Sequence, residues 1–162
     1  MSEQWNNDTV RALERRSIRT FMERNRDYLR GRVLDFGAGK QPYRDLVQGK
    51  YVPLERGDDL PSGEEGFDCI ICNQVFQYLE QPSGVLGRFN EWLYPTKGYL
   101  VMSYATNWDE VESEDLFRFT KKGMEFLLAR SKFEVVAHER RAEINLNGFK
   151  FPLGYGVVAR AS

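Results

Sequence analysis

The first thirty residues place polar and apolar side chains with the period of a helix. From about residue 8 to residue 30, apolar positions recur every three or four residues, and Asn7 or Asp8 can cap the start. Between Arg11 and Arg32 the chain carries eight arginines against three acidic residues, a surplus of five positive charges. We expect an amphipathic, arginine-rich helix over about 8–30. Its basic face is interpreted as solvated, with a phosphate-bearing or protein partner as the alternative.

Beyond Gly31 the pattern changes to short apolar runs separated by helical stretches. The apolar runs predict strands over about 32–36, 51–55, 67–76, 97–106, 133–141 and 155–161. Helical patterns lie at 42–47 with Pro42 in the first turn, at 84–95, and at 121–130 with Thr120 as the cap. Alternating strands and helices favour parallel strands joined by right-handed crossovers. We therefore expect an α/β fold with a doubly wound, mostly parallel sheet and helices on both faces.

Length and charge limit the class of protein. A chain of 162 residues is expected to form one domain over residues 1–162. The 23 Lys and Arg residues against 24 Asp and Glu residues give a net charge of −1, which argues against nucleic acid held by a uniform positive field. No apolar run approaches the roughly 20 residues that cross a bilayer, and the first residues lack the order of a secretion signal. We expect a cytoplasmic protein without a membrane segment.

The two cysteines, Cys69 and Cys72, lie in one apolar stretch, FDCIIC. In a strand, residues i and i+3 point to opposite faces, and a reactive pair needs a helix N-terminus to lower the pKa of its thiol. We interpret both as buried thiols. Two cysteines are too few for a disulfide framework or a zinc ribbon, and we expect no metal site.

In a sheet of this kind, ligands bind beyond the carboxyl ends of the strands, where the first strand-to-helix turn contributes backbone contacts. Here that turn is DFGAGKQP, residues 35–42. Gly37 permits a sharp turn and Gly39 lets a ligand approach the main chain, while the free amides of the following helix favour a carboxylate or phosphate. Glu55 closes the second expected strand 20 residues after Asp35, near the spacing at which an acid meets ribose hydroxyls. Pro42 replaces the third glycine of a dinucleotide fingerprint, and no GxxxxGK[ST] loop is present, so neither NAD nor ATP hydrolysis is expected.

Five ordered segments carry a resemblance to a known family. They are VLDFGAGKQPY (33–43), YVPLE (51–55), FDCIICNQVFQYL (67–79), LGRFNEWLYPTKGYLVMSYA (86–105) and LFRFTKKGMEFLLARSKFEVV (116–136). Over about residues 30–136 the chain resembles a class I S-adenosylmethionine-dependent methyltransferase of the methyltransferase type 11 kind. The resemblance implies a Rossmann-like fold with an antiparallel closing strand, and S-adenosylmethionine as the cofactor. It also implies methyl transfer by in-line displacement, without a metal, to an acceptor that the sequence does not identify and that we expect to be a small molecule.

The resemblance also assigns cofactor-binding residues. In the family, the first segment wraps the methionine part of the cofactor, which maps onto Asp35, Gly37, Ala38 and Gly39. The acid that closes the second strand binds ribose, which maps onto Glu55. The loop before the next strand flanks adenine, which maps onto Asp59 and Leu60. The turn after FDCIIC, at Asn73 and Gln74, lies beside the methionine moiety near the position of methyl transfer.

Two departures from the family leave a second function open. Relatives commonly carry a histidine after the third strand, whereas this chain reads Phe76-Gln77-Tyr78. Tyr78 is the catalytic candidate at that place, although a tyrosine hydroxyl is a poor base at neutral pH. Only 11 residues, Arg56 to Gly66, separate the second strand from FDCIIC, so we expect a sheet reduced at that edge. The alternative function is a cofactor-binding pseudoenzyme or regulatory module that acts through a partner without methyl transfer.

Two further features are interpreted as structural. His138 is the single histidine, and we expect a surface or edge position for it rather than a catalytic role. The stretch NWDEVESED (107–115) holds five acids and is interpreted as a solvated loop. Its alternatives are a lid or a surface that attracts a cationic acceptor.

Overall fold

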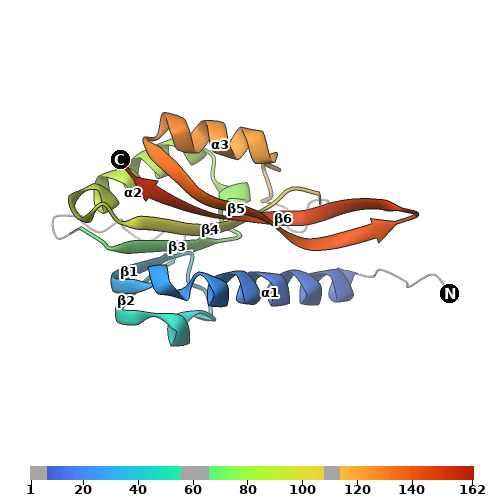
Figure 1. The fold of residues 1–162 in the computed structure, drawn as a ribbon, viewed down its shortest axis with the longest axis horizontal. Helices are drawn as coiled ribbons and strands as arrows, with labels where there is room; N and C mark the ends of the chain where they lie inside the picture. The colour runs from blue at the N-terminus through green and yellow to red at the C-terminus, as the bar shows by residue number, and fades with distance from the viewer. Residues whose placement is uncertain (1–6, 56–65, 108–113) are drawn as a thin grey trace.

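The computed structural model describes residues 7–55, 66–107 and 114–162. A six-stranded sheet forms the middle layer, with α1 on one face and α2 and α3 on the other (Figure 1). The strands are β1 (Arg30–Phe36), β2 (Gln48–Leu54), β3 (Cys69–Asn73), β4 (Tyr99–Ala105), β5 (Phe133–Leu146) and β6 (Phe149–Ala161). The helices are α1 (Asn7–Arg24), α2 (Pro82–Leu93) and α3 (Lys121–Arg130), and 3₁₀ turns lie at Arg26–Tyr28, Arg44–Leu46, Phe76–Tyr78 and Tyr94–Thr96.

The strand order is β2-β1-β3-β4-β6-β5. The first four strands of this order run parallel, β6 pairs antiparallel with β4, and β5 pairs antiparallel with β6. The predicted α/β fold, a mostly parallel Rossmann-like sheet with antiparallel closing, is confirmed. In the part of the chain that the structure describes, β2 is the outermost strand on the parallel side, as expected from the short connection between β2 and β3.

The N-terminal helical segment divides into two elements at Asn25. Helix α1 ends at Arg24, and the Asn25 side-chain amide donates a hydrogen bond to the Phe21 carbonyl at 2.9 Å. A 3₁₀ turn over Arg26–Tyr28 then leads into β1. The single helix expected over about 8–30 is therefore shorter, because the capping side chain of Asn25 satisfies a carbonyl of the last turn.

The helix expected after Pro42 does not form. Between residues 37 and 47, all of which are described, the regular structure is the 3₁₀ turn Arg44–Leu46, and Gln41 has a left-handed φ of 56°. β2 begins at Gln48, which leaves no length for a longer helix. Helix α1 covers this face instead, and Leu46 packs in the same apolar cluster as Phe21. The prediction was wrong because the apolar spacing over 43–47 fits a single turn equally well.

Apolar layers cover both faces of the sheet, and the two cysteines divide between them. Cys69 belongs to the cluster that includes Phe21 of α1, and Cys72 to the cluster that includes Phe89 of α2. Both thiols are free and fully buried. The prediction of two buried thiols on opposite faces is confirmed.

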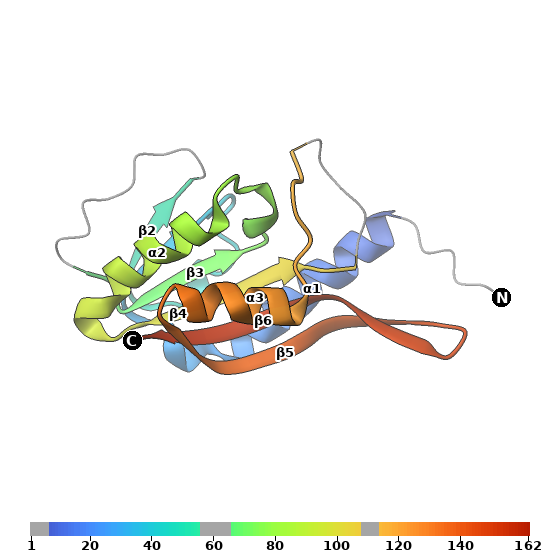
Figure 2. The ribbon, with the colours of Figure 1, turned by 90° about the horizontal axis from the view of Figure 1, so that it is seen from above.

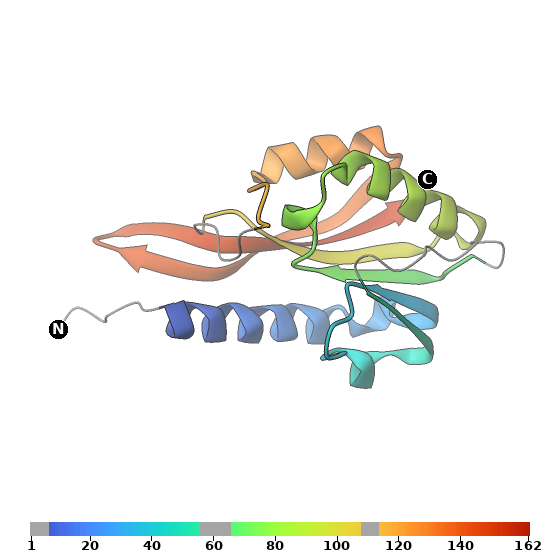
Figure 3. The same cartoon turned by 180° about the vertical axis from the view of Figure 1, so that it is seen from behind.

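Strands β5 and β6 form a hairpin that continues well past the end of β4, with α1 running alongside it (Figures 2 and 3). Val10 of α1 packs there with Ile144 and Leu153 of the hairpin. Both strands are longer than the sequence predicts, because Pro152 and Gly154 are atypical of a strand interior. The dipeptide Asn147-Gly148 is the sequence signal that indicates the longer hairpin. It forms the tip, where both residues have positive φ.

Candidate functional site

The carboxyl ends of β1, β2 and β3 bring together most of the predicted cofactor-binding residues. Asp35 lies near the end of β1, Glu55 follows β2, and Asn73 and Gln74 stand at the end of β3. The pairing of Asp35 with both Pro53 and Ile71 aligns these three strand ends. The predicted adenine contacts, Asp59 and Leu60, lie outside the described residues.

The turn after β1 leaves its apex open. The backbone N–H groups of Gly37 and Ala38 both donate to the Leu54 carbonyl, at 2.7 and 3.2 Å, which holds the turn against the end of β2. Gly37 has a φ of 77°, and a Cβ there would lie 2.4 Å from a methyl carbon of Val75. Gly39 has a φ of 50°, and a Cβ there would meet no atom within 4 Å. The open main chain at Gly39 therefore fits a ligand, but the expected helix N-terminus is absent, so helix amides do not supply an anion site here.

Asp35 is a buried carboxylate at this turn. It is 2 % exposed, and the Tyr51 hydroxyl donates a hydrogen bond to its Oδ2 at 2.6 Å. Burial raises the pKa of Asp35 to about 6; the Tyr51 hydrogen bond lowers it, and the negative charge of Glu55 raises it. Glu55 itself is exposed. Two carboxylates, one buried and one accessible, thus stand at the ends of neighbouring strands.

Asn73 and Gln74 form the turn after β3. The Asn73 side-chain amide donates to the Met22 sulfur at 3.3 Å, while its carbonyl oxygen is buried without a hydrogen-bond partner. Gln74 has a left-handed φ of 56°, and its backbone N–H donates to the Ser103 carbonyl at 2.9 Å. This bond joins the turn to β4 and directs the side chain of Gln74 into a cavity of about 100 Å³.

Tyr78 lies on the 3₁₀ turn Phe76–Tyr78 and lines the same cavity as Gln74. Its ring is partly exposed, whereas the neighbouring Gln77 is buried. The structure therefore brings Tyr78 to the edge of the predicted site, together with a glutamine that the sequence analysis did not single out.

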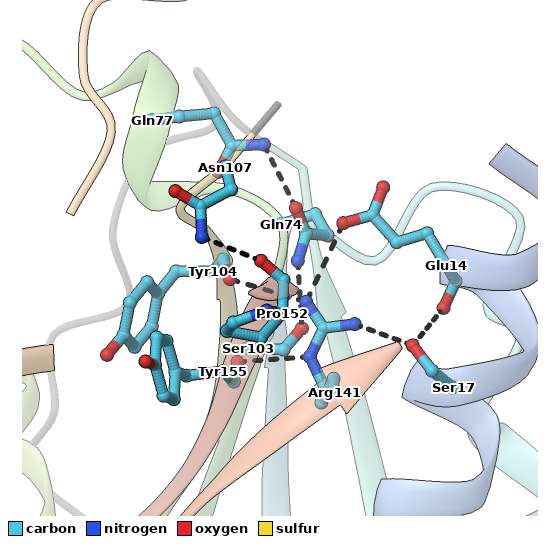
Figure 4. Close-up of polar contacts among 10 residues, drawn as sticks. All are labelled: Glu14, Ser17, Gln74, Gln77, Ser103, Tyr104, Asn107, Arg141, Pro152 and Tyr155. Atoms are coloured by element: carbon cyan, nitrogen blue, oxygen red, sulfur yellow. Dashed lines mark hydrogen bonds and ion pairs between the residues drawn. The ribbon is translucent and has the colours of Figure 1, made fainter. Parts of the chain in front are cut away.

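A buried polar group that the sequence analysis missed lies between α1 and the hairpin (Figure 4). Arg141 of β5 is 3 % exposed, and its guanidinium donates to the Tyr155 carbonyl at 3.0 Å, to Ser17 Oγ at 2.9 Å and to the Tyr104 carbonyl at 3.3 Å. The Glu14 carboxylate faces it, with 3.6 Å between Oε1 and Nη2. We call Glu14, Ser17 and Arg141 the Arg141 cluster.

The Arg141 cluster depends on a close approach at β6. A Cβ at Gly154 would lie 2.3 Å from the Tyr104 carbonyl oxygen and 2.4 Å from Arg141 Nη2. Burial raises the pKa of Glu14, and the nearby Arg141 charge only partly opposes this. Arg141 is a charged residue on a strand expected at the surface, so the sequence gives no direct signal that its side chain is buried. The indirect signal is Gly154, because glycine is unusual within a strand.

A second polar group occupies the opposite face of the hairpin. Tyr104 Oη lies 2.6 Å from His138 Nε2, and His138 Nδ1 lies 2.9 Å from Glu125 Oε1. Burial lowers the pKa of His138 and raises that of Tyr104. Tyr104 therefore donates to a neutral imidazole, whose Nδ1–H donates to Glu125. We call these three residues the His138 cluster. The edge position expected for His138 is confirmed, although its side chain is only 4 % exposed.

The acidic stretch 107–115 is described only at its ends. Residues 108–113 lie outside the described part, so the lid and the solvated loop are untested there. Asp115 contradicts a solvated position, because its side chain is 2 % exposed and pairs with Arg118 at 2.7 Å. Asp115 and Arg118 line the same cavity as Gln74.

Two features are absent from the described residues. No helix in 7–55, 66–107 or 114–162 has both the length and the apolar character needed to cross a membrane. Among the same residues, no group of three or more His, Cys, Asp or Glu side chains is placed to hold a metal ion.

Several solved structures share this fold. A chain in the complex of the Haloferax volcanii Trm112 methyltransferase activator with its candidate methyltransferase is 13% identical, with a TM-score of 0.68 over 95% of this chain and 92% of that one. A SAM-dependent methyltransferase from Archaeoglobus fulgidus is 14% identical, with a TM-score of 0.64 over 90% and 94%. Burkholderia thailandensis 1,6-didemethyltoxoflavin-N1-methyltransferase, with bound 1,6-didemethyltoxoflavin and S-adenosylhomocysteine, is 16% identical, with a TM-score of 0.59 over 96% and 86%. No curated protein matches the sequence.

The family comparison covers most of the chain. The methyltransferase domain family matches residues 10–141, from the first turn of α1 to Arg141 of the hairpin. This confirms the recognition made from the five sequence segments, including S-adenosylmethionine as the cofactor. The chain belongs to the methyltransferase domain family, as a class I S-adenosylmethionine-dependent methyltransferase.

Proposed function

We propose that the chain transfers a methyl group from S-adenosylmethionine to a small-molecule acceptor by in-line displacement, without a metal ion. The observation that carries this proposal is the open turn at Gly39, held against the end of β2 beside the carboxylates of Asp35 and Glu55. An open main chain next to two carboxylates fits an adenosyl amino acid, because carboxylates accept hydrogen bonds from an ammonium group and from ribose hydroxyls.

The described residues of the proposed binding set lie at this turn and at the neighbouring strand ends, whereas Asp59 and Leu60, outside the described residues, are included on the resemblance alone. Asp35 and the turn 37–39, with Gly37, Ala38 and Gly39, would hold the methionine part, Glu55 the ribose, and Asp59 and Leu60 the adenine. Asn73 and Gln74 would lie beside the transferred methyl group. When bound, the cofactor supplies a sulfonium methyl group that is already electrophilic. The chain then has to orient the reactants and exclude water, which contributes on the order of 7–11 kcal/mol.

A small acceptor is supported by the cavity beside Gln74. Its volume of about 100 Å³ is well below the roughly 300–1,000 Å³ of sites for drug-sized ligands. Tyr78 lines this cavity and is the proposed catalytic candidate there. The Burkholderia enzyme of the same fold holds a small-molecule acceptor.

The second candidate function is a cofactor-binding module that acts through a protein partner. Two observations favour it: the turn Phe76-Gln77-Tyr78 has no histidine, and a structure of the same fold occurs in a complex with the Trm112 activator. The arginine-rich helix α1 is the proposed surface for such a partner. This function predicts cofactor binding without methyl transfer.

The experiment is calorimetry with S-adenosylmethionine and S-adenosylhomocysteine on the full chain and on Gly39→Ala. We expect the wild type to bind and the variant to bind at least tenfold more weakly, because the new methyl group fills the open turn. The control is Gly148→Ala at the hairpin tip, since Gly148 also has positive φ, 86°, and open surroundings. Backbone strain is then similar in both variants. Absence of binding to the wild type at millimolar ligand would contradict the proposal.

The two candidate functions separate in a transfer assay. Cofactor with a labelled methyl group is added with the protein to the small-molecule fraction of a cell extract, and separately to its macromolecular fraction. Label in the small molecules supports methyl transfer to a small acceptor. Cofactor binding without label in either fraction supports the module that acts through a partner.

A further inference from the structure

A groove with a volume of about 250 Å³ lies between α1 and β5, where the helix runs alongside the hairpin (Figure 1). Helix α1 contributes the side chains of Arg16, Thr20 and Arg24 to its wall, and β5 contributes Glu139 and Arg140. None of the described residues in the proposed cofactor-binding set lines it. The groove is therefore a surface distinct from the open turn after β1.

The three α1 side chains form one stripe on the helix. Arg16, Thr20 and Arg24 are spaced at i, i+4 and i+8, and residues four apart share a helix face. At a rise of roughly 1.5 Å per residue, the backbone positions of Arg16 and Arg24 lie about 12 Å apart along the helix axis. An extended peptide rises about 3.3 Å per residue, so about four residues cover that length. The stripe therefore fits an extended chain with charges at both ends better than a single small anion.

The donors of this stripe are available to a ligand. In the part of the chain that the structure describes, neither the Arg16 guanidinium nor the Thr20 hydroxyl makes a hydrogen bond or an ion pair. The Arg24 guanidinium pairs with Glu139 at 3.9 Å, between side chains that are 69 % and 39 % exposed. Exposed pairs of this kind contribute little to stability, so Arg24 can exchange its partner for an incoming anion at little cost.

The side chains that line the groove carry an excess of positive charge. Four arginines and one acidic residue, Glu139, line it. Arg141 faces the buried carboxylate of Glu14, which balances its charge. The other three arginines exceed Glu139 by two charges, and Arg140 also pairs with Glu143 on the surface. A guanidinium has five N–H donors and no acceptor, so a ligand of the groove must supply anionic oxygen acceptors.

Apolar side chains in the groove favour a peptide over a nucleic acid. Leu13, Phe21 and Ala142 line it together with the charged groups. A phosphodiester chain carries a negative charge on every unit and would meet the carboxylate of Glu139, and a net charge of −1 on the chain provides no uniform positive field to hold it. A peptide can alternate carboxylates with apolar side chains, which matches both parts of the lining.

We propose that this groove docks an extended acidic segment of a protein partner, with carboxylates on the guanidiniums of Arg16 and Arg24 and an apolar side chain against Leu13. The inference deepens the second candidate function and rests on it for the existence of a protein partner. It leaves the open turn after β1 free for the cofactor, because the two surfaces share no described residue.

Three probes test the proposal on the full chain at low ionic strength. The first is a pentapeptide with blocked ends that alternates glutamate and leucine, so that its outer carboxylates stand about 13 Å apart when it is extended. The second has glutamine in place of each glutamate, and the third is a thymidine tetranucleotide with the same negative charge as the first. Binding is followed by NMR through the backbone amide signals of Arg16, Thr20 and Arg24. We expect saturable shifts with the glutamate peptide, and at least tenfold weaker binding of the other two probes.

Variants place the binding in the groove. Arg16→Gln and Arg24→Gln each remove one guanidinium, and each should weaken the glutamate peptide at least threefold, because each removes a charge-assisted contact. Arg15→Gln is the matched control, because Arg15 is the preceding residue of α1, is exposed and does not line the groove. It should change the affinity less than twofold. All three side chains are exposed, so we expect folded variants, which the amide spectrum verifies.

Four results would overturn the inference: no saturable shift with the glutamate peptide, equal affinity for the glutamine peptide, equal weakening by Arg15→Gln and Arg16→Gln, or a tetranucleotide that binds at least as tightly as the peptide. The last result would make the groove a nucleic-acid site. S-adenosylhomocysteine is titrated into the same samples. Cofactor binding without peptide binding would overturn this inference alone, whereas peptide binding without cofactor binding would support the groove and contradict the proposed methyl transfer.

Discussion

The Arg141 and His138 clusters lie on opposite faces of the same hairpin, and each connects it to a helix. In the His138 cluster every ring nitrogen has a partner, in a chain from Tyr104 through the imidazole to Glu125 of α3. In the Arg141 cluster three of the five N–H groups of the guanidinium donate hydrogen bonds, and the Glu14 carboxylate of α1 faces the guanidinium at 3.6 Å, as an ion pair.

This difference separates a hydrogen-bonded network from a cluster in which opposite charges also contribute. A satisfied buried network contributes to stability and leaves no capacity for a ligand. A buried ion pair at 3.6 Å depends on the mutual attraction of its two charges, so the removal of one partner leaves the other buried and uncompensated. The two clusters therefore predict different results when one member of each is removed.

The largest expected effect is on stability, from Arg141→Ala. The change leaves Glu14 buried without its counter-charge and removes one hydrogen bond from each of three acceptors, so we expect a loss of about 3–5 kcal/mol in the free energy of unfolding. Urea denaturation measures it. Arg140→Ala is the control, because Arg140 is the preceding residue of β5, exposed and paired with Glu143 on the surface. Equal losses in the two variants would contradict a special role for Arg141.

Asp35, in the proposed cofactor-binding set, is a third buried polar group that can be compared with the two clusters. Its pKa of about 6 exceeds the ordinary value of 3.8, so the folded chain holds this proton more tightly than the unfolded chain. The resulting contribution to the free energy of unfolding is about 3 kcal/mol. It is fully present below pH 4 and is lost as the pH rises through 6. Asp35→Asn should remove this pH dependence and be the more stable protein at pH 8, while binding the cofactor more weakly.

Thermal unfolding between pH 4 and pH 8 measures the Asp35 effect. Asp45→Asn, a change at a surface carboxylate, is the control. Arg19 lowers the pKa of Asp45 rather than raising it, so this variant should keep the pH dependence of the wild type. Parallel pH curves for the wild type and Asp35→Asn would show that Asp35 is not the group responsible.

A smaller loss is expected from His138→Phe. The Tyr104 hydroxyl loses its acceptor while it stays buried, which costs about 1–3 kcal/mol. Adding Tyr104→Phe removes the hydroxyl that has lost its acceptor. The double variant should therefore lose less free energy of unfolding than the two single variants together. Cofactor affinity should stay within twofold throughout. A larger change in affinity would show that the His138 cluster is not merely structural.

The sequence predicts the parallel half of the sheet well and the antiparallel half less well. Short apolar runs ending at Asp35, Glu55 and Asn73 place three strand ends at one edge, because parallel strands present the same end there. The helix after Pro42 was predicted wrongly, since three apolar positions cannot distinguish one turn from two. The extended hairpin was missed because the pairing over 142–154 buries side chains against α1, a contact that no local pattern records.

The cavity residues show the same limit. Glu14 reads as one acid within a basic helix, and Gln77 as a turn residue, so neither stands out in the sequence. Their significance arises only when α1, the turn after β3 and the segment around Asp115 meet. Glycine turns and strand-end acids are local signals, whereas a cavity wall is a property of tertiary packing.

The contact between Arg141 and Ser17 spans 124 residues of chain. Loops of this length close late, because their entropy must be overcome before the contact forms. A growing chain on the ribosome could therefore complete β1 to β4 while α1 still lacks its hairpin. The residues that line the cavity beside Gln74 all lie at or before Arg118, but Glu14 gains its buried counter-charge only when Arg141 has been made and the hairpin has formed, so this side of the molecule matures late.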